Sequence, residues 1–330
     1  MSRALSPLAR KRLGQALVGI VALLFAALAI RMLRHELRPE VWARMPAAIE
    51  ALPLWRIIGA VVVAVGVYTW LGCFDRLGFL VVRQPISTPF AMRTGFMAYA
   101  IVHNLGLALF TGTAFRAHRY RARGISAGTI ARIWGSNVVT MWTGFLLACG
   151  TALLWRPPGV LHGVVLERLI GAALIAVVVA YVVAAFIGVR PLRVKSFSIA
   201  VPQPTFAIAQ TLTGAVHWSL SALVLTLVLP DNPFFVDVLA ALCMAQVVAA
   251  ASHIPGGVGV LEGMLLLLLG GEGGLDRTGV IAGVLLFRAV YFLFPFALTI
   301  VGYAVGRVVV IVTGLSQARA GRGTRRAARV

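Results

Sequence analysis

Long runs of apolar residues recur along almost the entire chain, and short polar or charged stretches separate them. Most runs reach about 20 residues, the length that a helix needs to cross the hydrocarbon core of a bilayer. The runs are continuously apolar instead of alternating with polar residues, which excludes the strands of a membrane β-barrel. The pattern predicts an all-α integral membrane protein, a polytopic helix bundle with about eight membrane segments. We expect these segments at 13–33, 54–74, 88–112, 128–155, 164–188, 205–229, 236–252 and 277–311.

The stretch between the first two apolar runs, 39–52, has a different pattern. It places Trp42, Arg44 and Glu50 among small apolar residues. An aromatic ring with charges of both signs suits a short helix that lies in the membrane interface.

Composition supports the membrane interpretation. The 330 residues are 60% hydrophobic and 12% charged, whereas soluble domains carry about 25% charged residues. The formal net charge is +20, which in a soluble protein would suggest nucleic acid as a partner. Here the basic residues gather at the ends and in short loops, as they do on the cytoplasmic side of membrane proteins. We therefore expect anionic phospholipids as partners, and no nucleic acid.

The charges also predict the orientation and the division of the chain. Basic residues precede the first run and crowd the final residues, so both termini are expected in the cytoplasm. Acidic residues gather in two loops that fit the opposite side of the membrane. The division is a basic cytoplasmic tail at 1–12, a transmembrane domain at 13–313 and an Arg-rich cytoplasmic tail at 314–330.

The segment 94–112 does not fit a simple alternation of spans. Arginines flank it on both sides, and both flanks favour the cytoplasm. A re-entrant hairpin, which enters and leaves the bilayer on one face, resolves this conflict. The segment contains His103, Asn104, Thr111 and Gly112, residue types that permit irregular backbone where it is buried in protein or lines a cavity.

The segment 236–271 is a second exception, because both of its flanks are acidic. Its length suits two short helices with a break at 255–257, so it too would return to the face it entered. Two broken segments that enter from opposite faces are typical of transporters with a binding site between inverted repeats. His103 and His253 each precede a glycine by three residues, and this short match raises the hypothesis of an inverted repeat.

The break itself, 252–262, concentrates residues that could carry chemistry. Pro255 ends one helix, and the glycines that follow allow positive φ and close approach of a ligand. A helix that begins near Val258 would offer free N–H groups to an anion such as a lipid phosphate. Glu262 is costly at this depth, which indicates a functional or paired carboxylate. The alternative is a structural kink in which Glu262 only balances the helix dipole.

Arg288 lies about ten residues into the last apolar run, where an unpaired charge is costly. Glu262 is the acid in a broken membrane segment, so we expect the two side chains to pair. The alternative is that Arg288 extends to the nearer interface. Tyr291 follows one turn later, and Pro295 interrupts the helix after it.

The basic run 111–121 is the third candidate. Arg116 and Arg119 are three residues apart and share a helix face. Arginine binds phosphate with two hydrogen bonds, and Tyr120 could anchor at the interface. An ordinary cytoplasmic loop explains the same basic residues equally well.

Other chemistry has little support in the sequence. No nucleophile motif, metal-ligand spacing or nucleotide-binding loop stands out, so we expect no catalytic residue, metal or cofactor. The candidate lipid-binding and transport residues are His103, Asn104, Thr111, Gly112, Arg116, Arg119, Tyr120, His253, Pro255, Gly256, Gly257, Gly259, Glu262, Arg288 and Tyr291.

At these runs the chain resembles the membrane domain of the lysylphosphatidylglycerol synthase/flippase family, also called the multiple peptide resistance factor family. Residues 253–262 match its His-x-Pro-Gly-Gly-x-Gly-Val-x-Glu motif, and Arg288, Tyr291 and Pro295 match its Arg-x-x-Tyr-x-x-x-Pro pattern. Residues 111–120 match Thr-Gly-Gly-x-x-Arg-Tyr-Arg-x-Tyr, except that the second Gly and the Tyr-Arg pair are replaced. The resemblance covers roughly residues 50–313.

The resemblance implies a flippase-like module of the bacterial inner membrane that moves aminoacylated phosphatidylglycerol, such as lysylphosphatidylglycerol, between leaflets. It also implies a connection with resistance to antimicrobial peptides. In the family a separate soluble domain carries the aminoacyl transfer, and we expect no such domain here, so the chain is not expected to be a synthase.

Three hypotheses remain open at this point. The first is a lipid transporter. The second is a membrane-embedded transferase that acts on a lipid headgroup through His103, His253 and Glu262. The third is a membrane partner subunit of a separately encoded synthase, and a homodimer is also compatible with the sequence.

Overall fold

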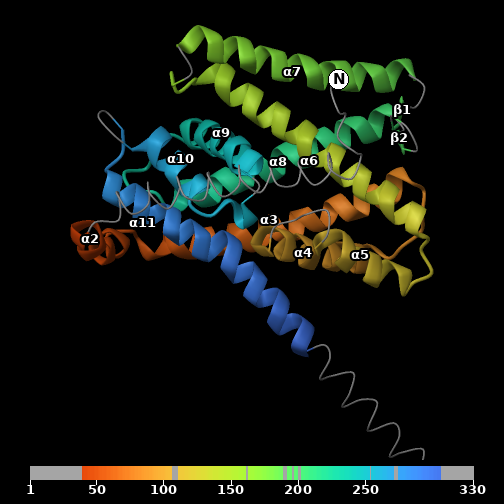
Figure 1. Ribbon diagram of the computed structural model, residues 1–330, viewed down its shortest axis with the longest axis horizontal. Helices are drawn as coiled ribbons and strands as arrows, with labels where there is room; N and C mark the ends of the chain where they lie inside the picture. Colours follow the sequence, from red (N-terminus) through yellow and green to blue (C-terminus); the bar gives the residue numbers. More distant parts are fainter. Residues whose placement is uncertain are drawn as a thin grey trace, which may run out of the picture.

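The computed structural model describes residues 39–105, 111–160, 163–188, 192–194, 197–199, 202–252, 254–270 and 274–305. The run predicted at 13–33, both predicted tails and His253 lie outside these residues. The described chain is a bundle of α-helices (Figure 1), with one short antiparallel ribbon of β1 (Leu192–Val194) and β2 (Phe197–Ile199). The predicted all-α polytopic membrane fold is confirmed.

Within the described residues, six helices are long and apolar enough to cross a membrane, and each corresponds to a predicted segment. The shorter helix α2 (Pro39–Glu50) forms where an interfacial helix was expected, and it packs against the last span. The six are α3 (Leu54–Val81), α6 (Ala127–Trp155), α7 (Val164–Ile187), α8 (Pro204–Val228), α9 (Phe235–Ser252) and a final span, Arg277–Val305, that begins as α11 (Arg277–Phe287).

The predicted segment 88–112 is two helices instead of one span. α4 (Thr88–Leu105) and α5 (Thr111–Arg121) pack against each other. A Cβ on Gly112, at the start of α5, would lie 2.2 Å from Val102 Cγ2 near the end of α4. Near the other end of α5, the Arg119 guanidinium lies 5.0 Å from the centroid of the Phe90 ring at the start of α4. The two helices are therefore antiparallel, as a hairpin requires.

α9 and α10 (Val260–Leu269) form the second hairpin around a 3-10 turn, Pro255–Gly257. Gly256, Gly257 and Gly259 have φ of +64°, +60° and +82°, so three glycines with positive φ bring the chain back. α10 has ten residues, a length of about 15 Å and so about half of the hydrocarbon core. A hairpin therefore forms at each predicted broken segment, but the first one continues to Arg121, beyond the predicted end at 112.

The centre of the bundle is the packing of α3, α6 and α8. Gly144 of α6 and Gly214 of α8 cross so closely that a Cβ on Gly144 would lie 2.1 Å from the Gly214 carbonyl carbon. Small residues commonly allow membrane helices to approach in this way. Arg56 of α3, which is 5% exposed, donates hydrogen bonds to the Thr226, Leu227 and Leu229 carbonyls at the end of α8. Those carbonyls have no partner within their own helix, so Arg56 caps α8.

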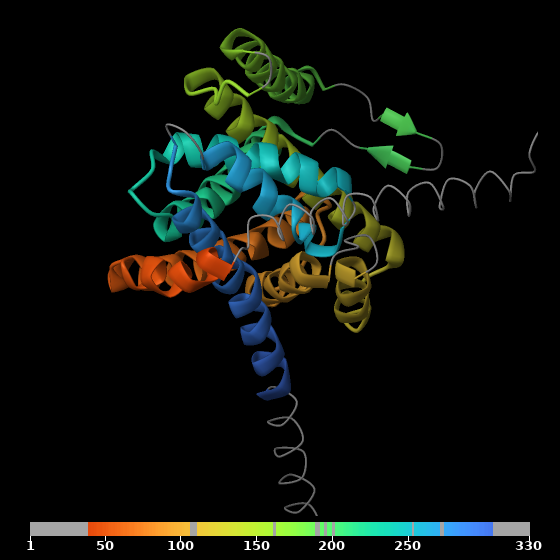
Figure 2. The same ribbon diagram turned by 60° about the vertical axis from the view of Figure 1, so that its left-hand side comes forward.

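Two elements lie at the outside of the bundle. α7 runs along α6 (Figure 1) and exposes Val165, Leu169 and Ile187. The final span extends away from the other helices (Figure 2), and Ile300 and Val301 are exposed on it. In a polytopic membrane protein such apolar surface faces lipid.

Candidate functional site

The tips of the two hairpins meet inside the bundle. α4 packs against the 3-10 turn of the second hairpin, and a Cβ on Gly256 would lie 3.4 Å from the His103 carbonyl oxygen. His103 Nδ1 lies 3.0 Å from the Tyr68 hydroxyl oxygen, and its ring stacks on Tyr291 at 6.1 Å between centroids. Two segments separated by about 150 residues in the sequence thus share one junction.

The predicted pairing of Arg288 with Glu262 is confirmed. Arg288 Nε donates to Glu262 Oε1, and Arg288 Nη1 donates to the Gly256 carbonyl oxygen at 2.6 Å. The two side chains are 14% and 11% exposed, so Arg288 does not extend to the interface. The pair fastens α10 to the last span and holds the turn that touches His103.

Glu262 also satisfies the backbone of its own helix, because its Oε2 accepts a hydrogen bond from Gly259 N–H at 2.7 Å. Pairing and dipole balance were alternatives in the sequence, and the structure shows both. The binding of a lipid phosphate by free N–H groups near Val258 stays a prediction, but the expected start of the helix is wrong. The helix begins at Val260, and Glu262 already accepts from Gly259 in front of it.

The last span is distorted where it reaches this junction. Arg288–Leu293 is a π-helical turn, and Pro295 follows two residues later. Proline removes a helix hydrogen bond, and π-turns are frequent at functional sites. The Phe292 carbonyl accepts a hydrogen bond from Asn104 Nδ2 at 2.9 Å, so a predicted site residue of the first hairpin joins the distorted backbone of the last span.

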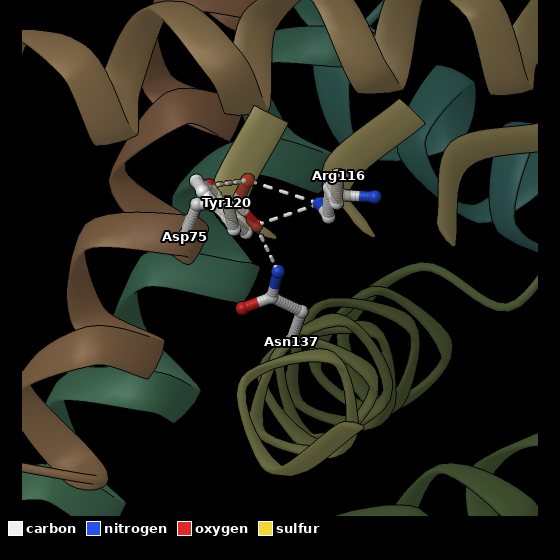
Figure 3. Close-up of polar contacts among 4 residues, drawn as sticks. All are labelled: Asp75, Arg116, Tyr120 and Asn137. Carbon is white, nitrogen blue, oxygen red and sulfur yellow. Dashed lines mark hydrogen bonds and ion pairs between the residues drawn. The ribbon is translucent and has the colours of Figure 1, made fainter. Parts of the chain in front are cut away.

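A second buried polar network ties the first hairpin to the bundle (Figure 3). Arg116 Nε of α5 lies 2.9 Å from both carboxylate oxygens of Asp75 in α3. Tyr120 donates to Asp75 Oδ2 at 2.8 Å, and Asn137 Nδ2 of α6 donates to Oδ1. All four side chains are at most 3% exposed.

This network changes the expectation for the basic run. Arg116 and Tyr120 turn into the bundle and bind Asp75, so they do not form one phosphate-binding face with Arg119. Asp75 was missed in the sequence because α3 was expected to end at 74, which placed Asp75 beside Arg76 in a cytoplasmic loop. Asn137 lay inside the predicted span 128–155, where its partner Asp75 was not expected. α3 continues to Val81, and the apolar residues Leu77 and Phe79 were the available signal.

A cavity of about 190 Å³ borders the hairpin junction. Its walls come from α4, α6, α8, α9, α10 and the last span, and they are mostly aromatic and aliphatic. His103, His217, Ser221 and Tyr291 place polar atoms on the wall, and the Ser221 and Tyr291 hydroxyls lie 2.9 Å apart. His217 Nδ1 is buried with no hydrogen-bond partner among the described residues. An apolar cavity with a few converging polar groups is typical of a ligand site.

The predicted residues therefore lie in different parts of the structure. His103, Asn104, Gly256, Glu262, Arg288 and Tyr291 meet at the junction. Gly257 and Gly259 shape its turn, whose backbone begins at Pro255, and Gly112 packs the first hairpin. Arg116 and Tyr120 belong to the Asp75 network, and Arg119 faces a separate pocket. The side chain of Thr111, like all of His253, lies outside the described part of the chain.

No protein-family model matches the chain. The chain is 29% identical over 272 residues to "Inner membrane protein YbhN" of Escherichia coli (strain K12), a match that covers 80% of this chain and 83% of that protein. It is 27% identical over 276 residues to "Uncharacterized protein slr0712" of Synechocystis sp. (strain ATCC 27184 / PCC 6803 / Kazusa), covering 81% and 84%. Neither name states an activity or refers to lysylphosphatidylglycerol, so that resemblance stays a prediction.

Proposed function

We propose that this protein moves phospholipid between the two leaflets of the inner membrane, and that the headgroup passes the junction of the two hairpins. The observation that carries this proposal is the meeting of two helical hairpins at His103 and Gly256, beside the largely buried Glu262–Arg288 pair. A polar headgroup cannot cross hydrocarbon without polar partners at depth. Such partners inside an otherwise apolar bundle mark a transport path.

The chemistry of the junction suits a charged headgroup. Arg288 Nη2 is buried and has no hydrogen-bond partner among the described residues, so it retains a donor for a phosphate oxygen. Glu262 would attract the ammonium group of an aminoacylated lipid. The resemblance to the lysylphosphatidylglycerol family supports such a lipid, and the adjoining cavity offers apolar walls to the part of the lipid nearest the headgroup.

Two observations support a location of the protein in the inner membrane. The chain has apolar helices of spanning length, and one relative is named an inner membrane protein. We place both termini in the cytoplasm because of the basic tails.

The contacts of Glu262, one of the three residues named for the transferase alternative, favour transport. A general acid or base needs a free proton-transfer group within reach of its substrate. Both Glu262 oxygens already accept hydrogen bonds, from Arg288 and from Gly259. Association with a second copy or with a separate synthase stays a prediction, and co-purification of such a protein with the tagged chain is its test.

A leaflet-transfer assay tests the proposal. The purified chain is reconstituted into liposomes that contain phosphatidylglycerol or lysylphosphatidylglycerol with a fluorescent acyl label. A membrane-impermeant reductant then bleaches the outer leaflet. We expect the protein to raise the bleached fraction above one half for at least one of these lipids. Equal bleaching with and without protein, for both lipids, would contradict the proposal.

A further inference from the structure

A second, basic pocket lies at the open end of the first hairpin, away from the hairpin tip. Its volume is about 520 Å³. The start of α4 contributes Phe90 and Arg93, and the end of α5 with the residues after it contributes His118, Arg119 and Arg123. The pocket therefore joins two chain segments that are adjacent only because the hairpin forms.

Phe90 holds two of the arginines in place. The Arg119 and Arg123 guanidinium carbons lie 5.0 Å and 4.3 Å from the centroid of its ring. Both distances are those of cation–π contacts. The ring is itself fixed by Tyr120, whose centroid lies 6.1 Å away and whose hydroxyl binds Asp75. The buried network thus positions the two guanidinium groups, and they are not free loop side chains.

The described residues that line the pocket carry positive charge and include no acid. Arg93 and Arg123 both lie within electrostatic range of Arg119, and like charges at this separation repel each other. Arg119 Nε is buried and has no hydrogen-bond partner among the described residues. No ion pair with these three arginines occurs in the part of the chain that the structure describes.

Other arginines of the bundle have a different environment. Arg56 donates to three backbone carbonyls. Arg116, Arg156 and Arg288 each bind a carboxylate. A site that holds three cations together and leaves a buried N–H donor unused has the charge and the donor to bind an anion.

We propose that this pocket binds a phosphate ester, the headgroup phosphate of an anionic phospholipid. Each guanidinium group can donate two parallel hydrogen bonds to phosphate oxygens. Three guanidinium groups offer more donors than a single carboxylate can accept, which favours phosphate as the anion. A lipid source fits the surroundings, because Tyr303 of the final span also lies within electrostatic range of Arg119. That part of the span exposes Ile300 and Val301, which would contact acyl chains. The site deepens the proposed function as the place where a lipid is first recognised.

Lipid binding to the purified full chain tests this site separately from transport. The protein in neutral detergent is titrated with phosphatidylglycerol, diacylglycerol or inorganic phosphate, and bound molecules are counted by native mass spectrometry. The variants are Arg119→Gln, Arg123→Gln and Arg119→Lys. The control is Arg121→Gln, an exposed arginine of the same helix outside the pocket.

We expect phosphatidylglycerol to bind the wild type and the Arg121→Gln control equally. It should bind Arg119→Gln and Arg123→Gln about tenfold more weakly. Arg119→Lys should fall between, because lysine keeps the charge but not the paired donors. Diacylglycerol, which lacks the phosphate, should not bind the pocket.

Equal loss in all variants including the control, or no loss in any, would overturn the proposal. Preferential binding of inorganic phosphate would overturn the lipid source. Arg123→Gln changes an exposed residue, so it still tests phosphate binding if Arg119→Gln does not fold. If the protein transports lipid but the pocket does not bind it, only this inference is wrong. If the pocket binds lipid but the protein does not transport it, only the proposed function is wrong.

Discussion

The Glu262–Arg288 pair offers the sharpest test of how the junction is held. Glu262→Gln removes the charge but keeps the shape of the side chain, and it leaves the Arg288 guanidinium without a carboxylate partner. Removing one partner of a buried ion pair costs about 3–5 kcal/mol. Because both side chains keep slight exposure, we expect about 3 kcal/mol, the lower end of that range. With an unfolding entropy of about 2.1 cal/mol/K per residue, a loss of this size lowers Tm by about 4 °C in a chain of 330 residues.

Thermal unfolding of the purified protein in detergent measures this loss. The double variant Glu262→Gln with Arg288→Met removes both charges, and we expect it to recover at least about 1 kcal/mol relative to the sum of the single variants. The control is Arg156→Gln, which breaks an ion pair whose side chains are 50% and 39% exposed. That variant should cost less than about 1 kcal/mol. The reasoning would be refuted if Glu262→Gln lost no more stability than Arg156→Gln. It would also be refuted if the loss in the double variant equalled the sum of the losses in the two single variants.

Three further predictions concern the frame around the junction. Asp75→Asn leaves the Arg116 charge buried without a carboxylate, so Tm should fall by as much as in Glu262→Gln, and an unchanged Tm would contradict the network in Figure 3. Arg56→Gln uncaps the end of α8 and should cost about 2–3 kcal/mol in the same unfolding assay; a loss below about 0.5 kcal/mol would argue against capping. Gly144→Val forces α6 from α8 and should cost at least about 2 kcal/mol, whereas Gly128→Ala meets nothing within 4 Å and should leave Tm unchanged; similar effects of the two would count against the close crossing.

The sequence predicts the spans and the two hairpins because their signals are local. Hydrophobic runs mark the helices, and the conflict of charges on each side of 94–112 and 236–271 marks the segments that turn back. The Glu262–Arg288 contact could also be predicted, since two opposite charges at membrane depth have few other partners. The inverted-repeat hypothesis stays a prediction, because the match at His103 and His253 includes residues outside the described chain.

The partners of Arg116 could not be predicted in the same way. Asp75 precedes Arg116 by 41 positions, and only the packing of α5 against the bundle brings them together. In the sequence, Asp75 next to Arg76 has the pattern of a polar loop, and the arginines of 111–121 have the pattern of an ordinary cytoplasmic flank. Tertiary packing therefore decides which arginines are internal and which, like Arg119, face a pocket.

The most direct test of the central claim is the leaflet-transfer rate of labelled phospholipid in liposomes that contain the double variant Glu262→Gln with Arg288→Met. If the charges at the hairpin junction carry the headgroup, this variant should lose most of the protein-dependent transfer although its loss of stability is smaller than the sum of the two single variants. Arg156→Gln should transfer lipid at the wild-type rate. Transfer by the double variant at the wild-type rate would contradict the claim that the headgroup passes the junction.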